Sequence, residues 1–388
     1  MVCGADSLFP PALALASCTP TIRAMSPPLN RVAEAIRLLE SFSQAHGAPG
    51  HEDAVRTLLL REFPRRKASF DRLGSAMLAP ATTVKGPRVV LTAHMDEVGF
   101  LVQEITAAGF LRLAPLGGWP DGVLAAQRLR VLCRSTGTER IGVVAALPPH
   151  QGGHQALTVE QVHVDIGARS RESALAAGVR LGDPVVPDGP FSLLADPGLV
   201  AGKAFDNRAG MAALALATRE LDATDDAPPC DVRALATVQE EVGCRGAETA
   251  ARLAEPDVVI VLEGPPADDL PGMSPASAQG ALGRGVQIRA YDPTAIMSPR
   301  LLDLAVATAM EQGIPHQVTV RRSGGTDARS FQRHGLGCPV IVLGVPSRYI
   351  HTHHAVLDLA DLLATVDLAK AMVRRLDART VASLVNFT

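Results

Sequence analysis

Several side chains of the kinds that bind catalytic metals follow directly after short apolar runs in this sequence. The runs have the length and β-branched content of buried parallel strands, and ligands bind outside the carboxyl ends of such strands. Imidazoles and carboxylates without thiolates form a ligand set that suits zinc, cobalt or manganese. The residues are His94 and Asp96 after 88–93, Glu240 and Glu241 after 232–239, Glu263 after 258–262, His351 beyond 339–344, and Asp206 before the alanine-rich segment 208–221.

The set is large enough for two metal ions that share one carboxylate. Three ligand carboxylates carry about three negative charges, two divalent ions carry about four positive charges, and one bridging hydroxide balances them. Two ions about 3.5 to 4 Å apart lower the pKa of the shared water and hold a substrate carbonyl. The chemistry predicted from these residue types is therefore hydrolysis.

Glu240 and Glu241 are adjacent, and both can face one site only if the preceding strand has already ended. One of them can then bind metal while the other stays unligated and takes a proton from water. Asp96 can accept the second N–H of the His94 imidazole and so fix its tautomer. Each residue alone also has an ordinary interpretation, such as a solvated glutamate pair or a helix N-cap at Asp206. Only the joint pattern favours a site.

The elements around these residues alternate between helical and strand patterns. Such alternation predicts a doubly wound α/β sheet in three αβα layers. The expected elements are helices at 31–45, 208–221, 246–253, 299–312 and 357–376, and strands at 88–93, 232–239, 257–262 and 339–344.

A segment of different texture interrupts this pattern. Glycine and proline are frequent there, strand-like runs at 128–133 and 141–146 lie between turns, and 170–177 is the one helix-like stretch. This composition predicts a small β-rich module inserted into one α/β domain. The expected divisions are a flexible extension at 1–25, a discontinuous catalytic domain at 26–98 and 195–388, and an inserted domain at 99–194.

The overall composition argues against several classes of function. Lys plus Arg number 37 and Asp plus Glu number 40, a formal net charge of −3 that offers no basic surface to nucleic acid or anionic membranes. No apolar run approaches the roughly 18 residues that span a bilayer, and the first 25 residues lack the basic start of a signal peptide. The six cysteines form no CxxC pair, so we expect a cytoplasmic protein.

Five segments around the candidate residues form an ordered series: LTAHMDEVGF (91–100), GKAFDNRAG (202–210), TVQEEVGCRGA (237–247), SGGTDA (323–328) and GVPSRYIHTHHAVLDLADL (344–362). They resemble the motifs of the M42 family of metallo-aminopeptidases, which includes the tetrahedral aminopeptidases and members named glutamyl aminopeptidase or endoglucanase. The resemblance extends from about Gly47 to about Leu376 and omits the N-terminal tail.

The resemblance implies a dinuclear-metal peptidase domain with a small barrel-like or PDZ-like dimerisation domain inserted into it. It implies two divalent ions per subunit, zinc or cobalt first and manganese as the further option. It also implies that Glu240 is the general base, that Asp96 stands behind His94, and that dimers assemble into a tetrahedral dodecamer. The implied ligands are His94, Asp206 and Glu263 for one ion, and Glu241, Asp206 and His351 for the other.

The sequence departs from the family pattern at three places. Glu263 stands where members frequently have aspartate, and Asn207 replaces what is often a second acid after Asp206. His353 and His354 follow His351 where a small residue and proline are expected, so they are candidates to compete for metal or to line the substrate pocket. No departure removes an implied ligand.

We therefore expect a metal-dependent aminopeptidase that removes the N-terminal residue of small peptides through a metal-bridging water activated by Glu240. One alternative is an N-acyl amidohydrolase or deacylase that uses the same two-metal site. Another is a catalytically silent assembly protein. The sequence leaves the preferred N-terminal residue and the physiological metal open.

Overall fold

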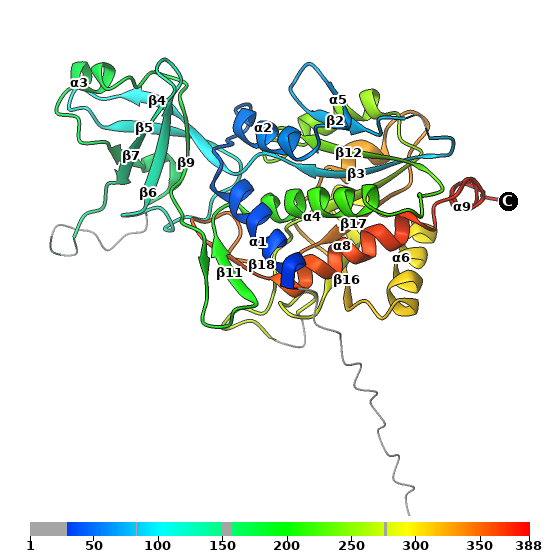
Figure 1. Ribbon diagram of the computed structural model, residues 1–388. Coiled ribbons are helices and arrows are strands. Elements are labelled where there is room, and N and C mark those ends of the chain that lie inside the picture. The colour runs from blue at the N-terminus through cyan, green and yellow to red at the C-terminus, as the bar shows by residue number, and fades with distance from the viewer. Residues whose placement is uncertain (1–28, 83, 149, 151–156, 275–277) are drawn as a thin grey trace, which may run out of the picture.

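The computed structural model in Figure 1 describes residues 29–82, 84–148, 150, 157–274 and 278–388, so the predicted extension at 1–25 lies outside the described residues. The helices are α1 (Leu29–Gln44), α2 (Asp53–Glu62), α3 (Arg171–Ala176), α4 (Phe205–Asp222), α5 (Arg245–Ala254), α6 (Pro299–Glu311), α7 (Ala328–Gln332), α8 (Leu359–Val373), α9 (Ala378–Leu384) and the 3-10 helix η2 (Val159–Gln161). The strands are β1 (Lys67–Phe70), β2 (Ala76–Ala79), β3 (Arg88–His94), β4 (Gly99–Ile105), β5 (Leu111–Leu116), β6 (Arg128–Cys133), β7 (Thr138–Val144), β8 (His163–Asp165), β9 (Pro184–Pro187), β10 (Ser192–Leu193), β11 (Leu199–Gly202), β12 (Asp231–Thr237), β13 (Val258–Glu263), β14 (Val286–Asp292), β15 (Ala295–Ile296), β16 (His316–Val320), β17 (Val340–Gly344), β18 (Ser347–Arg348) and β19 (Ala355–Asp358).

A nine-stranded mixed sheet forms the centre of the larger body, in the order β1-β2-β12-β3-β13-β17-β14-β15, with β16 beside β14. Its middle strands β12, β3, β13 and β17 run parallel, whereas β2 and β14 flank them antiparallel. Every residue of β13 and β17 is buried, as expected for strands covered on both faces. The four parallel strands therefore end at one common edge of the sheet.

Helices cover both faces of this sheet, which confirms the predicted three layers. Figure 1 shows α1, α4 and α8 together in front of the sheet, where α4 packs on β3 and β13. On the other face α5 and α7 contact each other and pack on β12 and β17. The sheet-facing helix α4 is rich in buried alanines, whose short side chains let the helix approach the strands closely.

The interrupting segment forms a closed antiparallel barrel in the order β4-β5-β8-β7-β6-β9, which Figure 1 shows to one side of the sheet. It has a hydrophobic core of its own, centred on side chains such as Phe100, Leu129 and Val164. The predicted β-rich insertion, with its helix at 170–177, is therefore confirmed as a six-stranded barrel with α3. Its predicted limits at 99 and 194 and its role in dimerisation stay predictions.

Element ends differ from prediction where tertiary pairing overrides local pattern. The predicted helix at 357–376 begins at Leu359, because residues 355–358 pair with β11 as a strand and the Asp358 side chain caps the helix by accepting from the Ala360 N–H. The predicted strand at 232–239 ends at Thr237. Within the described ranges, none of the helices is long and apolar enough to cross a membrane.

Candidate active site

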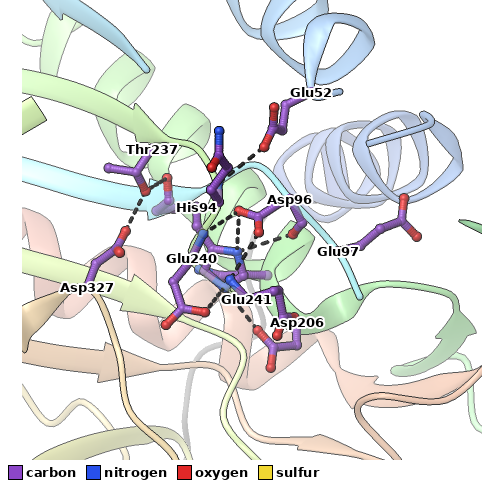
Figure 2. A network of polar contacts seen from close by, with 12 residues as sticks. Glu52, His94, Asp96, Glu97, Asp206, Thr237, Glu240, Glu241 and Asp327 are labelled. Carbon is purple, nitrogen blue, oxygen red and sulfur yellow. Dashed lines mark hydrogen bonds and ion pairs between the residues drawn. The ribbon is translucent and has the colours of Figure 1, made fainter. Parts of the chain in front are cut away.

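The side chains predicted from strand ends meet at the carboxyl edge of the central sheet. His94 ends β3, Glu263 ends β13, and the two glutamates follow β12 by three and four residues. Six of the seven predicted site residues line one pocket with a cavity volume of about 370 Å³. The seventh, Asp96, is fully buried beneath the pocket wall beside Glu240 and Glu241 (Figure 2).

The carboxylate of Asp206 lies between the two histidines. Its Oδ1 is 3.2 Å from Nε2 of His94, and its Oδ2 is 3.4 Å from Nε2 of His351. At the start of the regular part of α4 it is the Asn207 Oδ1, and not the Asp206 carboxylate, that accepts the Gly210 N–H, so the ordinary interpretation of Asp206 as an N-cap is wrong. The backbone at Asp206 is non-helical, and its peptide bond to Asn207 is cis. One carboxylate therefore faces both imidazoles with a different oxygen.

Hydrogen bonds at the far nitrogens fix how both imidazoles present Nε2. Nδ1 of His351 donates to the carbonyl of Gly118, 2.7 Å away in the inserted segment. Nδ1 of His94 lies 3.2 Å from the Asp96 carbonyl and 3.5 Å from its carboxylate. Because Nδ1 is the donor in each ring, Nε2 is left as the nitrogen that can bind a metal.

The Asp96 carboxylate also holds the turn that follows β12. Its two oxygens accept the N–H groups of Glu240 and Glu241, each at 3.0 Å, and Figure 2 shows Asp96 at the centre of these contacts. Because the strand ends at Thr237, the adjacent glutamates are free of strand alternation and both reach the pocket.

Two groups of side chains at the site have the atoms and spacing to hold an ion. His94, Asp206 and Glu263 form one group, and Asp206, Glu241 and His351 form the other, with ligand atoms within 4.8 Å of one another in each. Oε1 of Glu241 and Oε1 of Glu263 are buried and have no hydrogen-bond partner among the described residues. Buried oxygens without donors fit cations as their partners, so the donor set fits a pair of divalent ions.

The pKa shifts of the site residues also favour bound cations. Burial and nearby carboxylates raise the pKa of Glu263 well above its usual value, and burial with the neighbouring Asp206 raises the pKa of Glu241 to about 8. Burial opposes the charge on His351, yet the Asp206 and Glu241 carboxylates raise its pKa to about 9. The same balance at His94, with Glu263 and Asp206 outweighing burial, raises its pKa well above the usual range. Without cations the clustered carboxyl groups therefore hold protons in place of ionising together, and bound cations would replace those protons.

Glu240 belongs to neither of these two groups. Its Oε2 is 3.9 Å from Nε2 of His94, and its Oε1 accepts a hydrogen bond from the Cys244 thiol at 3.3 Å. Burial, with Asp327 and Glu241 nearby, raises the pKa of Glu240 well above its usual value. The carboxyl group therefore lies beside the candidate metal pair, outside both ligand groups, where it can accept a proton.

The two extra histidines lie apart from this arrangement. His353 is buried against the Trp119 ring at 6.1 Å between centroids, and His354 is exposed. Burial lowers the pKa of His353 to about 4, so it packs as a neutral ring. Neither histidine belongs to a ligand group or lines the main pocket in the part of the chain that the structure describes. The hypothesis that they compete for metal or line the pocket is therefore wrong.

Asn207 has a structural explanation. Its Nδ2 donates to the Leu262 carbonyl at 2.9 Å, and its Oδ1 accepts the Gly210 N–H at 2.9 Å. Only an amide can donate and accept in this way, because an ionised carboxylate has no proton to give to the carbonyl. This bond ties the start of α4 to the end of β13.

Sequence reasoning gave no role to three residues beside the site. Asp327 lies within the SGGTDA segment, which was a usable signal, and Cys244 lies within the segment that carries the glutamates. Gly118 acts through its backbone carbonyl, for which residue type gives no signal.

Comparison with known proteins shows to which family a chain with this site belongs. The family model of the M42 glutamyl aminopeptidases matches residues 74–368. The chain belongs to the M42 glutamyl aminopeptidase family. This M42 aminopeptidase is therefore a metallo-aminopeptidase, a hydrolase of peptide bonds.

Relatives match nearly the whole M42 aminopeptidase. The glutamyl aminopeptidase of Lactococcus lactis subsp. cremoris is 31% identical over 362 residues, which covers 90% of this chain and 98% of that protein. The crystal structure of the TET aminopeptidase from Thaumarchaeota archaeon SCGC AB-539-E09 is 34% identical, with a TM-score of 0.87 and coverage of 91% and 99%. The TET1 peptidase of Pyrococcus horikoshii, which can assemble into a tetrahedron or a large octahedral shell, is 32% identical, with a TM-score of 0.78 and coverage of 87% and 99%.

Proposed function

We propose that this M42 aminopeptidase removes the N-terminal residue of small unblocked peptides in the cytoplasm, with two divalent ions bound in each subunit. His94, Asp206 and Glu263 would hold one ion, and Asp206, Glu241 and His351 the other, with zinc or cobalt as the expected metals and manganese as the further option. The observation that carries the proposal is the Asp206 carboxylate between two imidazoles, 3.2 and 3.4 Å away, with an unligated Glu240 beside them.

When bound, two such ions would lower the pKa of a shared water and polarise the carbonyl of the scissile bond. Glu240 takes the proton from the attacking water and returns it to the leaving amine. Its raised pKa favours the first step, because the carboxylate then holds a proton more strongly than an ordinary glutamate does. Asp96 acts behind the site by orienting His94 and by holding the turn that carries both glutamates.

The pocket also supports a preference for an acidic N-terminal residue. Three arginines, Arg289, Arg321 and Arg329, line the same cavity as the carboxylates. The carboxylates attract the substrate ammonium, and a guanidinium suits the side-chain carboxylate of the N-terminal residue. Arg289 is nearly buried and pairs with Asp292 through Nη1 at 3.1 Å, which holds it in place. Arg289→Met is expected to lower kcat/KM for glutamyl substrates by about tenfold relative to leucyl substrates.

Glu240→Gln tests the assignment of the base. The substitution keeps the size of the side chain and removes the group that takes the proton, so kcat is expected to fall by about two to four orders of magnitude. Metal content should stay at two ions per chain, because Glu240 is not among the proposed ligands of the pair. Activity equal to that of the unmodified enzyme would refute the assignment.

A panel of aminoacyl amides, each unblocked or N-acetylated, tests the reaction. Chelator-treated protein is resupplied with zinc, cobalt or manganese in separate samples. Release from unblocked substrates alone is expected, because the ammonium is part of what the carboxylates bind. Cleavage of the acetylated set would instead favour the deacylase alternative.

The same proposal includes a homo-oligomer in which dimers, joined through the barrel, assemble into a dodecamer. The tetrahedral assembly of the Pyrococcus horikoshii relative supports it. Light scattering on the purified enzyme is expected to give about twelve times the mass of one chain. A monomeric mass would contradict the assembly and leave the site proposal intact.

A further inference from the structure

A third group of possible metal ligands lies beside the proposed base, separate from the two groups already described. Glu240, Cys244 and Asp327 each offer one ligand atom, and the three atoms lie within 4.8 Å of one another. Glu240 and Cys244 line the main pocket, so an ion can reach the group from solvent. Unlike the other two groups, this one contains sulfur.

Asp327 provides an independent sign that the group lacks a partner. The residue is fully buried, and its Oδ1 has no hydrogen-bond partner among the described residues. Its other oxygen, Oδ2, accepts from the Thr237 hydroxyl, which fixes the carboxylate (Figure 2). Leaving a buried carboxylate oxygen unpaired is unfavourable, and a cation would satisfy it.

The turn after β12 holds the thiol next to Glu240. The Cys244 N–H donates to the Glu240 carbonyl at 2.9 Å, and its Sγ lies 3.3 Å from Glu240 Oε1. The Ser330 hydroxyl donates to the Cys244 carbonyl at 3.2 Å. Backbone and side chain of Cys244 are thus both fixed, and the thiol is positioned before any ion binds.

We propose that Glu240, Cys244 and Asp327 form an inhibitory zinc site. One thiolate with two carboxylates favours zinc over manganese, because sulfur is a soft ligand. Binding transfers the thiol proton to solvent and forms a bond from sulfur to zinc. The site lies next to the proposed metal pair, so repulsion between like charges weakens it, and it fills only when zinc is in excess.

The inhibitory consequence rests on the proposed function of Glu240. A zinc ion that binds this carboxylate prevents it from accepting a proton from water. Zinc is therefore expected to activate the chelator-treated enzyme at low concentration and to inhibit it in excess, whereas excess manganese does not inhibit.

Titration of the full chain with Co²⁺ tests the site without reference to activity. Sulfur bound to cobalt gives a charge-transfer absorption in the near ultraviolet, and the proposed pair of ions has no sulfur ligand. The absorption is expected after about two equivalents have bound, and Cys244→Ala should abolish it. Cys338→Ala is the matched control, because Cys338 is also 6% exposed and lies in no ligand group among the described residues.

A charge-transfer band that is absent from the unmodified protein, or that persists in Cys244→Ala, would overturn the proposal. Asp327→Asn is the second variant, and it is expected to weaken the third binding step by at least about tenfold while keeping the size of the side chain. In the activity assay, the zinc concentration for half inhibition should rise by at least about tenfold in Cys244→Ala, and an unchanged value would also overturn the proposal. A band without inhibition would keep the zinc site and contradict Glu240 as the base.

Discussion

Replacing Asp96 by asparagine tests whether this side chain positions the site residues in addition to stabilising the fold. The Asp96 carboxylate accepts two backbone N–H groups at 3.0 Å each, from the residues proposed as base and ligand. Asparagine keeps one oxygen and turns an NH₂ group toward the second N–H, so one charged hydrogen bond is lost and one buried donor is left unpaired. A loss of about 2 to 4 kcal/mol in unfolding free energy is expected.

The same change should also loosen the proposed metal ligands. Removing a supporting group behind a ligand typically lowers metal affinity or activity by about 10- to 100-fold. Zinc affinity is measured by competition with a coloured chelator, kcat on an unblocked aminoacyl amide, and stability by urea unfolding in the presence of chelator.

Asp361→Asn is the matched control. Asp361 is also buried and accepts two backbone N–H groups, from Gly283 at 2.7 Å and Gly285 at 2.6 Å, but it does not line the pocket. Burial raises the pKa of Asp361 to about 7, so the variants are compared at about pH 8, where the native carboxyl is mostly ionised. The control should lose similar stability with unchanged zinc affinity. If Asp96→Asn behaves like the control in all three measurements, the positioning role of Asp96 is wrong.

Three further outcomes are expected. In the metal-free native state the pKa of Glu241 is raised to about 8 and that of His351 to about 9, so this state keeps protons that the unfolded chain has lost, and its stability falls as pH rises from about 5 to 9. Thermal unfolding should therefore show that zinc stabilises the protein more at about pH 8 than at about pH 5. A zinc-induced rise in unfolding temperature that is independent of pH would contradict this prediction. Gly264→Ala should lower the metal content measured by elemental analysis. The Cβ of the new alanine would lie 2.4 Å from a carbonyl oxygen and 3.0 Å from the Cα of the shared aspartate. Two ions per chain in this variant would show that the backbone there can move without harm. Lys203→Met should lower the unfolding free energy by about 3 to 5 kcal/mol, since it leaves a fully buried glutamate with one fewer cation. Arg88→Met breaks an exposed ion pair and should change the unfolding free energy by at most about 1 kcal/mol. Equal midpoints of urea unfolding for the two variants would contradict this expectation.

Residue types at strand ends carried most of the prediction of the site. Apolar runs show where buried parallel strands end, and parallel strands of one sheet end at one edge, so His94, Glu241 and Glu263 could be expected together. Asp206 could be expected only from the joint pattern, because a lone aspartate before a helix fits a simple cap equally well. The resemblance to a family then distributed the roles among them.

The parts that the sequence did not predict depend on contacts between distant segments. The strand β19 forms because residues 355–358 pair with β11, and no local sequence pattern indicates that pairing. The edge strands β1 and β16 are short and partly exposed, so they lack the apolar run that marked the central strands. Asp327 could have been found from its motif, but its unpaired oxygen depends on how Thr237 and Cys244 surround it.

The contact between His351 and the Gly118 carbonyl links the barrel to the chemistry of the larger domain. Trp119, which follows Gly118 in the sequence, stacks on Phe100 with 4.9 Å between ring centroids, and its indole N–H donates to the Gly99 carbonyl at 3.3 Å. The loop is therefore anchored to the barrel while its carbonyl orients a histidine of the other domain. Exchange of the barrel between relatives, whether in evolution or in the laboratory, must preserve the length and path of this loop, since an inserted or deleted residue would move the Gly118 carbonyl away from His351.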